Sequence, residues 1–447
     1  MKKNIKLFGL LLMAGMAFTA CSSDDIEGQA NSQQENKTWT AMMDVAKGLD
    51  TRTLTLSGTS LNVGWNTSEK VYVYRSNELV GTLSPSTITT STSVSMTGTL
   101  DGNTYAVGNP VTLRFPREEV DYTGQDGTLA TIAAKYDYAL GSTTVKSVSG
   151  NSVTFNTATL ISQQAIVKFT FPWAVKMVSV YGSEDVLDEP IVVLPTTAIS
   201  TVYVALPMAE SAVASYVVTA VRASDNRETV VKKTGVLMQN GKYYTCAFTE
   251  SDMATPTYFN LGLSVNWCAY NLDLTSTSNS KLTVDVTKDG SRFAWGETKT
   301  KDTGYSMNTY KFYNTTTGKY TKYVNSSNHG TVDNLTVLQL TDDAARAANS
   351  NYRMPTEQEA QELFDSNKCF RTQYNMDGEY YTIVTSKISG REGNAIIFRT
   401  GNDQYLWTST LGGTTPNAVG FSMNGNEIAS FLSLYRPYDY QIRPVRP

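Results

Sequence analysis

Short alternating segments separated by turn residues fill the first part of the chain. Residues 70–75 (Lys-Val-Tyr-Val-Tyr-Arg) alternate with a period of two, so their valines and tyrosines point to opposite faces of a strand. Residues 39–45 and 111–115 are two further candidate strands, and Pro116 ends the second of them. Strands that recur every 8–12 residues between such turns predict an antiparallel β-sandwich over residues 37–157.

A second set of strands begins near Ala158. Residues 164–171 and 201–206 are largely apolar, and each segment stops at a proline. Residues 216–221 and 228–232 flank Ala223-Ser224-Asp225-Asn226, which is typical of a hairpin turn. We therefore expect a second antiparallel sandwich over residues 158–252.

The pattern changes near residue 256, where tryptophan becomes frequent and two short helices are predicted. Residues 341–348 begin with a good N-cap and carry acids in the first turn. Thr356 and Glu359 form a capping box, after which Ala360, Leu363 and Phe364 fall on one helical face. Strands and long loops surround these helices, so residues 257–447 are expected to form an α+β domain, in which Trp407 is a core residue.

The N-terminus has the pattern of an export signal. Three lysines precede an apolar stretch over residues 7–20, which is too short for a lasting transmembrane helix. The junction Ala20-Cys21 resembles a bacterial lipobox, which implies cleavage after a 1–20 signal peptide and lipid attachment at Cys21. The alternative is an ordinary signal peptide with a chance cysteine. Residues 22–27 resemble the surface-export signal of Bacteroidota lipoproteins, and residues 21–36 are expected to be a flexible tether.

Composition excludes several functions. The chain has 447 residues, a formal net charge of −4, only 17% charged residues and a single histidine, His329. Removing three signal-peptide lysines leaves 34 basic against 41 acidic residues, or −7, so a nucleic-acid partner is not expected. One histidine excludes a multi-histidine metal site and disfavours a Ser-His-Asp hydrolase. No metal and no cofactor are predicted.

Residues 37–250 resemble the fimbrillin family of Mfa-like and FimA-like pilins. The resemblance is carried by Thr51-Arg52-Thr53, Gly64-Trp65 and the strand at 71–74, and then by residues 155–169, 203–207 and 240–244. It implies a mainly β fold of two transthyretin-like sandwiches that assemble by donor-strand exchange, after proteolysis behind an arginine removes a first strand. Arg52 is our candidate for that cleavage, and an ordinary exposed arginine is the alternative.

Residues 257–447 resemble the Fibrobacter succinogenes major paralogous domain family. The matching segments are 258–269, 293–298, 342–345, 352–356, 406–410 and 441–446. The resemblance implies a C-type-lectin-like fold that displays loops for ligands. Residues 353–357 also look like the formylglycine-generating enzyme group, whose chemistry needs reactive cysteines near the C-terminus. The last cysteine here is Cys369, so no enzymatic activity is predicted.

Cysteine and surface residues supply the remaining candidates. Cys268 and Cys369 both sit in matched motifs and are expected to pair, with two buried free thiols as the alternative. Asn402, Asp403 and Asn417 are the nearest approach to a calcium loop, although turn chemistry explains them equally well and is favoured. A possible adhesive surface of aromatic side chains comprises Tyr374, Tyr380, Tyr381, Tyr435 and Tyr438, with half-buried core positions as the alternative.

These observations predict a cell-surface, outer-membrane lipoprotein of a fimbrial system that presents a C-terminal ligand-binding domain. In ordinary pilins of the resembled family the C-terminal strand is donated to the next subunit, whereas here the chain continues for about 190 residues. That favours a tip or accessory subunit, with other fimbrial subunits, the outer membrane through a lipid anchor, and a host or bacterial glycan or protein as partners. The rival is a non-polymerising surface lipoprotein that binds glycan or protein.

Overall fold

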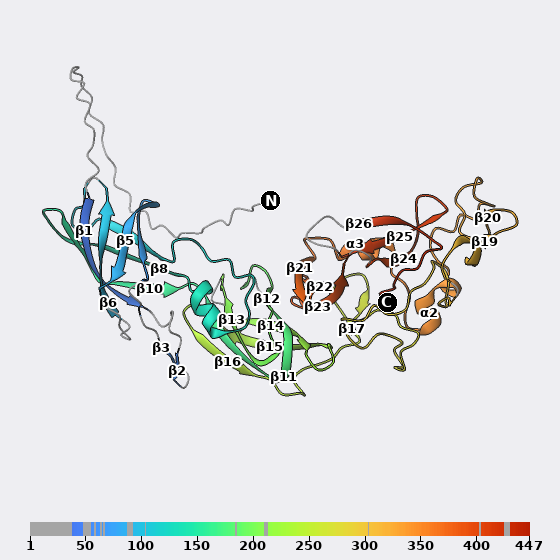
Figure 1. Ribbon diagram of the computed structural model, residues 1–447, viewed down its shortest axis with the longest axis horizontal. Coiled ribbons are helices and arrows are strands. Elements are labelled where there is room, and N and C mark those ends of the chain that lie inside the picture. Colours follow the sequence, from blue (N-terminus) through green and yellow to red (C-terminus); the bar gives the residue numbers. More distant parts are fainter. Residues whose placement is uncertain are drawn as a thin grey trace, which may run out of the picture.

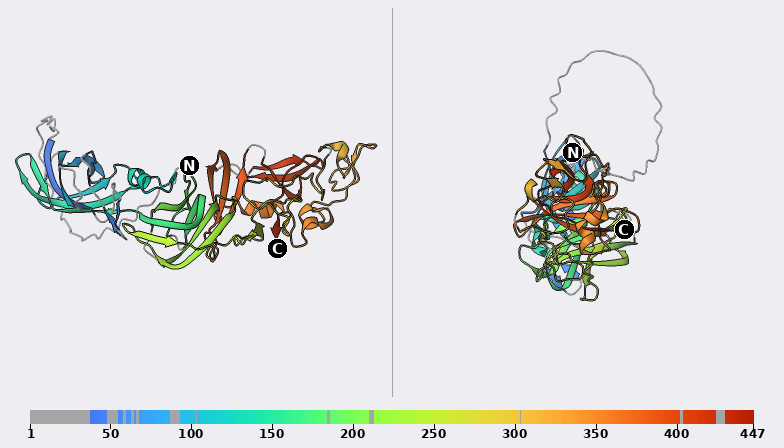
Figure 2. Two further views of the ribbon diagram at one scale, coloured as in Figure 1. Left: turned by 60° about the horizontal axis from the view of Figure 1, so that its bottom comes forward. Right: turned by 90° about the vertical axis from the view of Figure 1, so that its right-hand side faces the viewer.

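The computed structural model arranges the chain as three β-rich units in a row (Figure 1). It describes residues 38–447 except 48–54, 58–59, 63–64, 66–67, 87–92, 103, 184–185, 210–212, 303, 402–403 and 424–429. Strands far outnumber helices in this part of the chain, which confirms the expectation of a mainly β protein. Two further views show the same succession of units (Figure 2). Among the described residues, no helix has both the length and the apolar character needed to cross a bilayer.

Eight strands of the first unit form one sheet that closes on itself. In hydrogen-bonded order they are β10 (Ala158–Ser162), β1 (Thr38–Lys47), β6 (Ser93–Asp101), β5 (Glu78–Pro85), β4 (Val71–Arg75), β7 (Pro110–Phe115), β8 (Ala139–Ser149) and β9 (Ser152–Phe155). Closure arises because β10 also pairs with β8, and β1 also pairs with β9. A separate two-stranded hairpin joins β2 (Thr55–Ser57) and β3 (Ser60–Asn62).

The first sheet extends past residue 157, where the sequence pattern placed its end. Strand β10 alternates buried and exposed positions, and its Ala158 and Leu160 side chains enter the core of the first sheet. Its register pairs it with β1 and β8 rather than with any strand of the second unit. The boundary therefore lies near residue 162.

A single long strand organises the second unit. Strand β11 (Ala165–Gly182) pairs through its first half with β13 (Ile199–Leu206) and, in parallel, with β16 (Tyr243–Ala247). Its second half pairs with β12 (Ile191–Val193) and β14 (Val213–Arg222), and β14 pairs in turn with β15 (Glu228–Leu237). A turn with Asn226 at φ 54° joins β14 to β15, which confirms the hairpin expected at residues 223–226.

A helical segment ties the first unit to the second. Helix α1 (Leu129–Thr131) continues as η1 (Ile132–Tyr136), and Ile132 and Tyr136 pack against side chains of β11 and β13. Just before it, the buried side chain of Gln125 forms two hydrogen bonds of 2.8 Å with the backbone N–H and carbonyl of Ala205. These hydrogen bonds give partners to the N–H and the carbonyl of Ala205, which would otherwise be unpaired in the protein interior.

The third unit contains several small sheets and short helices. The sheets are β17 (Tyr258–Phe259), β18 (Asn266–Cys268) and β27 (Val445–Arg446); β19 (Tyr313–Asn314) and β20 (Lys319–Tyr320); β21 (Cys369–Met376), β22 (Glu379–Ser386) and β23 (Ala395–Thr400); and β24 (Leu406–Leu411), β25 (Asn417–Ser422) and β26 (Ser430–Tyr435). The helical segments are η2 (Met307–Thr309), η3 (Leu340–Asp342), α2 (Ala344–Ala348) and α3 (Glu357–Glu362). Pairing of β18 with β27 joins the two ends of this unit.

Each of the two short helices of the third unit begins at a residue whose side chain caps its first turn. Thr356 caps α3, and Glu359 returns the interaction to the Thr356 backbone, which confirms the predicted capping box. Ala360 and Leu363 are fully buried, as the helical face requires. The start of α2 differs from expectation, because Asp343 is its N-cap and residues 340–342 form η3 instead. The carboxylate of Asp343 accepts two backbone N–H groups there, which a threonine hydroxyl at position 341 would not reach.

The second and third units share a packed interface. Met177 and Val221 of the second sheet belong to the core of the third unit, and Lys176 forms a 2.6 Å ion pair with Asp377. Glu228, at the start of β15, is fully buried there, and its backbone N–H donates to the Tyr270 hydroxyl at 3.2 Å. The buried guanidinium of Arg443 is the positive charge that acts on the carboxyl group of Glu228. A carboxyl group thus lies in the interior between two units.

This carboxyl makes the stability of the protein depend on pH. Burial raises the pKa of Glu228 to about 8 from an ordinary 4.5, against the opposing effect of Arg443. The folded state then holds a proton that the unfolded state releases, so folding stability falls as pH rises from about 4.5 to about 8. We expect Glu228→Gln to become more stable relative to the native protein across this window, by roughly 1–3 kcal/mol at its upper end. Urea denaturation at pH 5 and pH 8 measures the difference.

The exposed Glu118→Gln is the matched control for Glu228→Gln, because it removes the same charge from the surface. Its urea midpoint should shift by the same amount at both pH values. A Glu228→Gln variant whose relative stability does not change between pH 5 and pH 8 would contradict the assignment.

Candidate functional site

Strand β1 occupies a groove in the first sheet and is bonded along both of its edges. It pairs antiparallel with β6 over nine residue pairs, from Thr38–Asp101 to Ala46–Ser93. Its other edge runs parallel to β9 and then to β10, over three residue pairs each. Mixed pairing of this kind places one N-terminal strand between two parts of the sheet that would otherwise end as open edges.

The side chains of β1 complete the core of the first unit. Trp39, Ala41, Met43 and Val45 alternate along the strand and are all at most 4% exposed. The Trp39 ring packs edge-on against Tyr105 with centroids 5.4 Å apart, and its indole N–H donates to the Gly102 carbonyl at 3.1 Å. Removing β1 would therefore open a groove with one aromatic-sized and three smaller apolar positions, together with two rows of unpaired backbone groups.

Four sequence-predicted site residues fall outside the residues that the structure describes. They are the lipidation site Cys21, the cleavage site Arg52, and the loop residues Asn402 and Asp403. Arg52 follows β1 by five positions in the chain, so the cut that we predict separates β1 from the rest of the first unit.

The predicted ligand surface is partly assembled. Asn417 at the start of β25 lies directly opposite Tyr435 at the end of β26. Tyr438 packs edge-on against Tyr435, with centroids 5.2 Å apart, and is 50% exposed. Burial and the neighbouring Tyr435 side chain both raise the pKa of Tyr320, a buried residue of β20. Asn417 of β25 thus joins Tyr435 and Tyr438 in one aromatic and polar patch, which we call the Tyr435 patch (Asn417, Tyr435 and Tyr438).

Two of the other tyrosines offered as adhesive surface are core residues. Tyr374 and Tyr381 are at most 5% exposed and stack on each other across the β21–β22 ladder, with centroids 5.6 Å apart. Both point to the buried face of that sheet, whereas the neighbouring Tyr380 points outward and is 54% exposed. Trp407 is fully buried and donates its indole N–H to the Phe293 carbonyl at 2.8 Å, which confirms its place in the core.

A buried arginine supports the Tyr435 patch from behind. Arg436 is fully buried, and its guanidinium donates to the carbonyls of Lys322, Tyr323 and Thr415 over 2.7–3.0 Å. It also donates to the Tyr310 hydroxyl at 3.0 Å and lies 4.7–5.9 Å from the ring centroids of Trp295, Tyr310, Tyr320 and Tyr323. The sequence offered no signal for this role, because the partners are backbone carbonyls of two segments far from each other in the chain.

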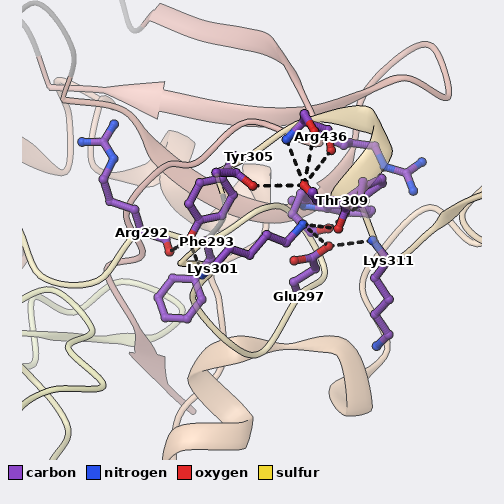
Figure 3. Close-up of polar contacts among 12 residues, drawn as sticks. Arg292, Phe293, Glu297, Lys301, Tyr305, Thr309, Lys311 and Arg436 are labelled. Atoms are coloured by element: carbon purple, nitrogen blue, oxygen red, sulfur yellow. Dashed lines mark hydrogen bonds and ion pairs between the residues drawn. The ribbon is translucent and has the colours of Figure 1, made fainter.

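The motif at residues 293–298 has a structural role beside this arginine (Figure 3). The Glu297 carboxylate accepts from the Lys301 ammonium at 2.8 Å and from the Lys311 backbone N–H at 2.7 Å. Lys301 also donates to the Thr309 carbonyl at 2.6 Å, and the Tyr305 hydroxyl donates to the Arg292 carbonyl at 2.6 Å. These bonds hold the long loop that precedes β19 against the core.

A second carboxylate holds the next part of the loop. Asp342 is 5% exposed, and its oxygens accept from the ammonium groups of Lys311 at 2.8 Å and Lys322 at 2.6 Å. The Tyr323 hydroxyl donates to it at 2.7 Å. The hydrogen bonds from these three groups outweigh burial and keep the pKa of Asp342 below its usual value.

The expected disulfide is absent from the structure, in which Cys268 and Cys369 are both free and buried. The Cys268 thiol lies next to Tyr352 and near Arg443, whereas Cys369 lies among Glu362, Asp365 and Arg371. Different neighbours of this kind indicate separate positions in the third unit. Burial raises the pKa of each thiol to about 12, so neither is a reactive thiolate at neutral pH.

Among the described residues, no group of three or more His, Cys, Asp or Glu side chains has metal-binding geometry. The carboxyl groups of Asp342 and Glu359 are held by lysine, arginine and backbone donors in structural networks. What the arrangement offers is a strand-filled groove at one end and an aromatic, hydroxyl-rich surface at the other.

Comparisons with solved structures find proteins that correspond to about half of this chain. A candidate cell adhesion protein from Bacteroides uniformis matches with 12% identity and a TM-score of 0.28, over 50% of this chain and 96% of its own. The tip fimbrial protein Mfa3 from Porphyromonas gingivalis, with a C-terminal truncation, matches with 8% identity and a TM-score of 0.27, over 48% and 98%. A fimbrial assembly protein from Parabacteroides distasonis matches with 12% identity and a TM-score of 0.26, over 48% and 93%.

No protein-family model and no curated protein matches this chain.

Loss of the buried arginine should destabilise the third unit. Arg436→Met keeps much of the apolar stem but leaves three backbone carbonyls without donors, so we expect a loss of roughly 2–4 kcal/mol in unfolding free energy. The half-exposed Arg292, paired with Asp439 at 3.0 Å, is the matched control. Arg292→Met should cost about 1 kcal/mol or less. Equal urea midpoints for the two variants would refute the supporting role of Arg436.

Proposed function

We propose that this protein is a cell-surface lipoprotein that works as a tip or accessory subunit of a fimbria. In this proposal Cys21 is acylated and anchors the uncut precursor in the outer membrane through the tether of residues 21–36, and the third unit presents a ligand-binding surface. The proposed partners are other fimbrial subunits and a glycan or protein ligand. No catalytic step is part of the proposal.

The observation that carries the proposal is the placement of β1. This strand supplies four core side chains, is bonded along both edges, and is followed within five residues by Arg52. A cut at Arg52 would detach it from the rest of the sheet, and the resulting groove has the pattern that an incoming strand can fill. Main-chain hydrogen bonds along β6, β9 and β10 would give affinity, and the alternating apolar positions would give register.

The third unit supports a terminal position in the fibre. Strand β16 pairs with β11, and the chain then continues directly into the third unit, which packs on the second through Met177, Val221 and Glu228. Releasing β16 as a donor strand would disrupt that interface. A subunit that accepts a strand but cannot donate β16 ends a polymer, which is the place for a tip or accessory protein.

A specific observation favours the rival, a surface lipoprotein that does not polymerise. The first sheet is already closed by its own β1, so the uncut chain offers no strand-deficient groove there. If residue 52 is never cleaved, the protein would act as a monomeric binder near the membrane. Copurification with a fimbrial stalk separates the two functions.

Cleavage at Arg52 is directly testable. Mass spectrometry of the surface-assembled protein should find an N-terminus just after residue 52, and Arg52→Gln should keep residues 21–52 and lose incorporation into fibres. Arg117→Gln, an exposed arginine of the same unit, is the control and should be processed normally. An assembled native protein that still begins at Cys21 would remove the donor-strand hypothesis.

The position in the fibre is tested by labelling. Antibody-gold against the third unit should mark one end of each isolated fibre, because a subunit without a free donor strand can occur only once per polymer. A repeating label along the shaft would contradict the tip or accessory assignment.

A further inference from the structure

A polar pocket lies at the end of the molecule farthest from β1. It has a volume of about 450 Å³ and is lined by residues on both sides of the β19–β20 hairpin and by the loop that follows, with Lys319, Tyr320, Thr321, Ser327, Gly330 and Thr331 among them. Figure 1 shows this hairpin at the opposite end of the row from the first sheet. A volume of this size lies within the range of small-molecule sites.

The pocket is held open by backbone contacts. The backbone N–H of Tyr320 donates to the His329 carbonyl at 2.8 Å, which brings residues 327–331 alongside β20. Gly330 then approaches so closely that a Cβ there would lie 2.3 Å from the Tyr320 carbonyl oxygen. The Tyr320 ring is fixed from below by the Arg436 guanidinium, 4.7 Å from its centroid. Tyr320 is therefore held in place at the base of the pocket, whereas residues 327–331 at its side belong to a loop.

The pocket is lined mainly by residues with hydroxyl groups and by one positively charged residue. Hydroxyl groups of Thr317, Thr321, Ser327 and Thr331 line the pocket, and Lys319 is its single charged side chain. Lys319 donates to the Asn328 carbonyl at 2.6 Å, which leaves two of its three N–H groups available. The neighbouring Lys301, Lys311 and Lys322 each pair with a carboxylate, whereas the described residues place no carboxylate on Lys319.

We propose that this pocket binds a saccharide that carries a carboxylate. Hydroxyl and amide groups match the hydroxyls of a sugar ring, and a lysine with spare donors and no internal anion matches a single negative charge. The absence of acids from the lining disfavours a cationic ligand. Tyr320, which lines the pocket, lies beside Tyr435 of the Tyr435 patch, so a longer glycan could extend over Tyr438. This inference rests on the proposed ligand-binding role of the third unit.

Binding is tested on the full chain with three probes: sialyllactose, an oligosaccharide that contains glucuronic acid, and lactose. Calorimetric titration at low salt should give at least one acidic probe an affinity about tenfold or more above that of lactose, and this advantage should shrink as salt is raised. Lys319→Gln should remove the advantage, and Thr321→Val should weaken acidic and neutral probes alike. Lys299→Gln and Thr300→Val, which are exposed on the same unit and lie outside the pocket, are the matched controls.

Several outcomes would overturn the site. They are no binding of either acidic probe, equal affinity for acidic probes and lactose, or binding that Lys319→Gln leaves unchanged while its urea midpoint is native. The same variants are also scored for copurification with fimbriae. A native chain that binds acidic sugar but never associates with fibres would contradict the fimbrial function and leave the pocket standing, whereas normal association without sugar binding would do the reverse.

Discussion

Open strand edges are the constraint on which this molecule is built. Each edge exposes a row of backbone donors and acceptors that must be paired or covered. In the first unit a single strand, β1, meets this requirement by bonding β6 on one side and β9 and β10 on the other. The same strand fills the core with four apolar side chains. One segment near the N-terminal end of the described residues therefore closes the first sheet.

The third unit solves a different problem, because it has little regular structure to hold it together. Its long loops are fixed by ion pairs such as those of Asp342 with Lys311 and Lys322, and by buried arginines that bond to backbone carbonyls. Arg436 reaches three carbonyls and four aromatic rings, and Arg443 donates to the carbonyls of Cys268, Ala269 and Ile397. A guanidinium with five donors can satisfy several separated segments at once, which a hydrophobic side chain cannot do. Loop display at the far end of the molecule depends on these two anchors.

The first sheet with its strand β1 and the loops held by Arg436 and Arg443 lie at different places along the molecule, and this placement bears on the proposed function. The strand-filled groove lies in the first unit, the polar pocket lies at the opposite end, and the second unit is packed against both neighbours. In the function that we propose, this arrangement would separate attachment to the fibre from contact with a ligand. The carboxyl group of Glu228 is buried at the interface between the second and third units. Its raised pKa therefore depends on the packing of these two units against each other.

Local patterns determined much of what could be predicted. Alternation and turn residues gave the mainly β character and the hairpin at residues 223–226, and the capping box of Thr356 and Glu359 fixed the start of α3. Each of these depends on interactions within a few residues, so neighbouring positions in the chain carry the whole signal. The patterns did not predict that Tyr374 and Tyr381 are buried in the core. They also did not predict that Cys268 and Cys369 are both free thiols in the structure.

Tertiary structure decided the features that require distant segments to meet. Closure of the first sheet joins residues near 40 to residues near 155, Arg436 bonds carbonyls of residues 322, 323 and 415, and the pocket forms because residue 329 pairs with residue 320. Backbone carbonyls are the same at every position, so their role as partners leaves no mark in the order of side chains. The sequence by itself thus determined the mainly β character, several strands and the start of α3, and only the packing of distant elements decided where a groove and a pocket would lie.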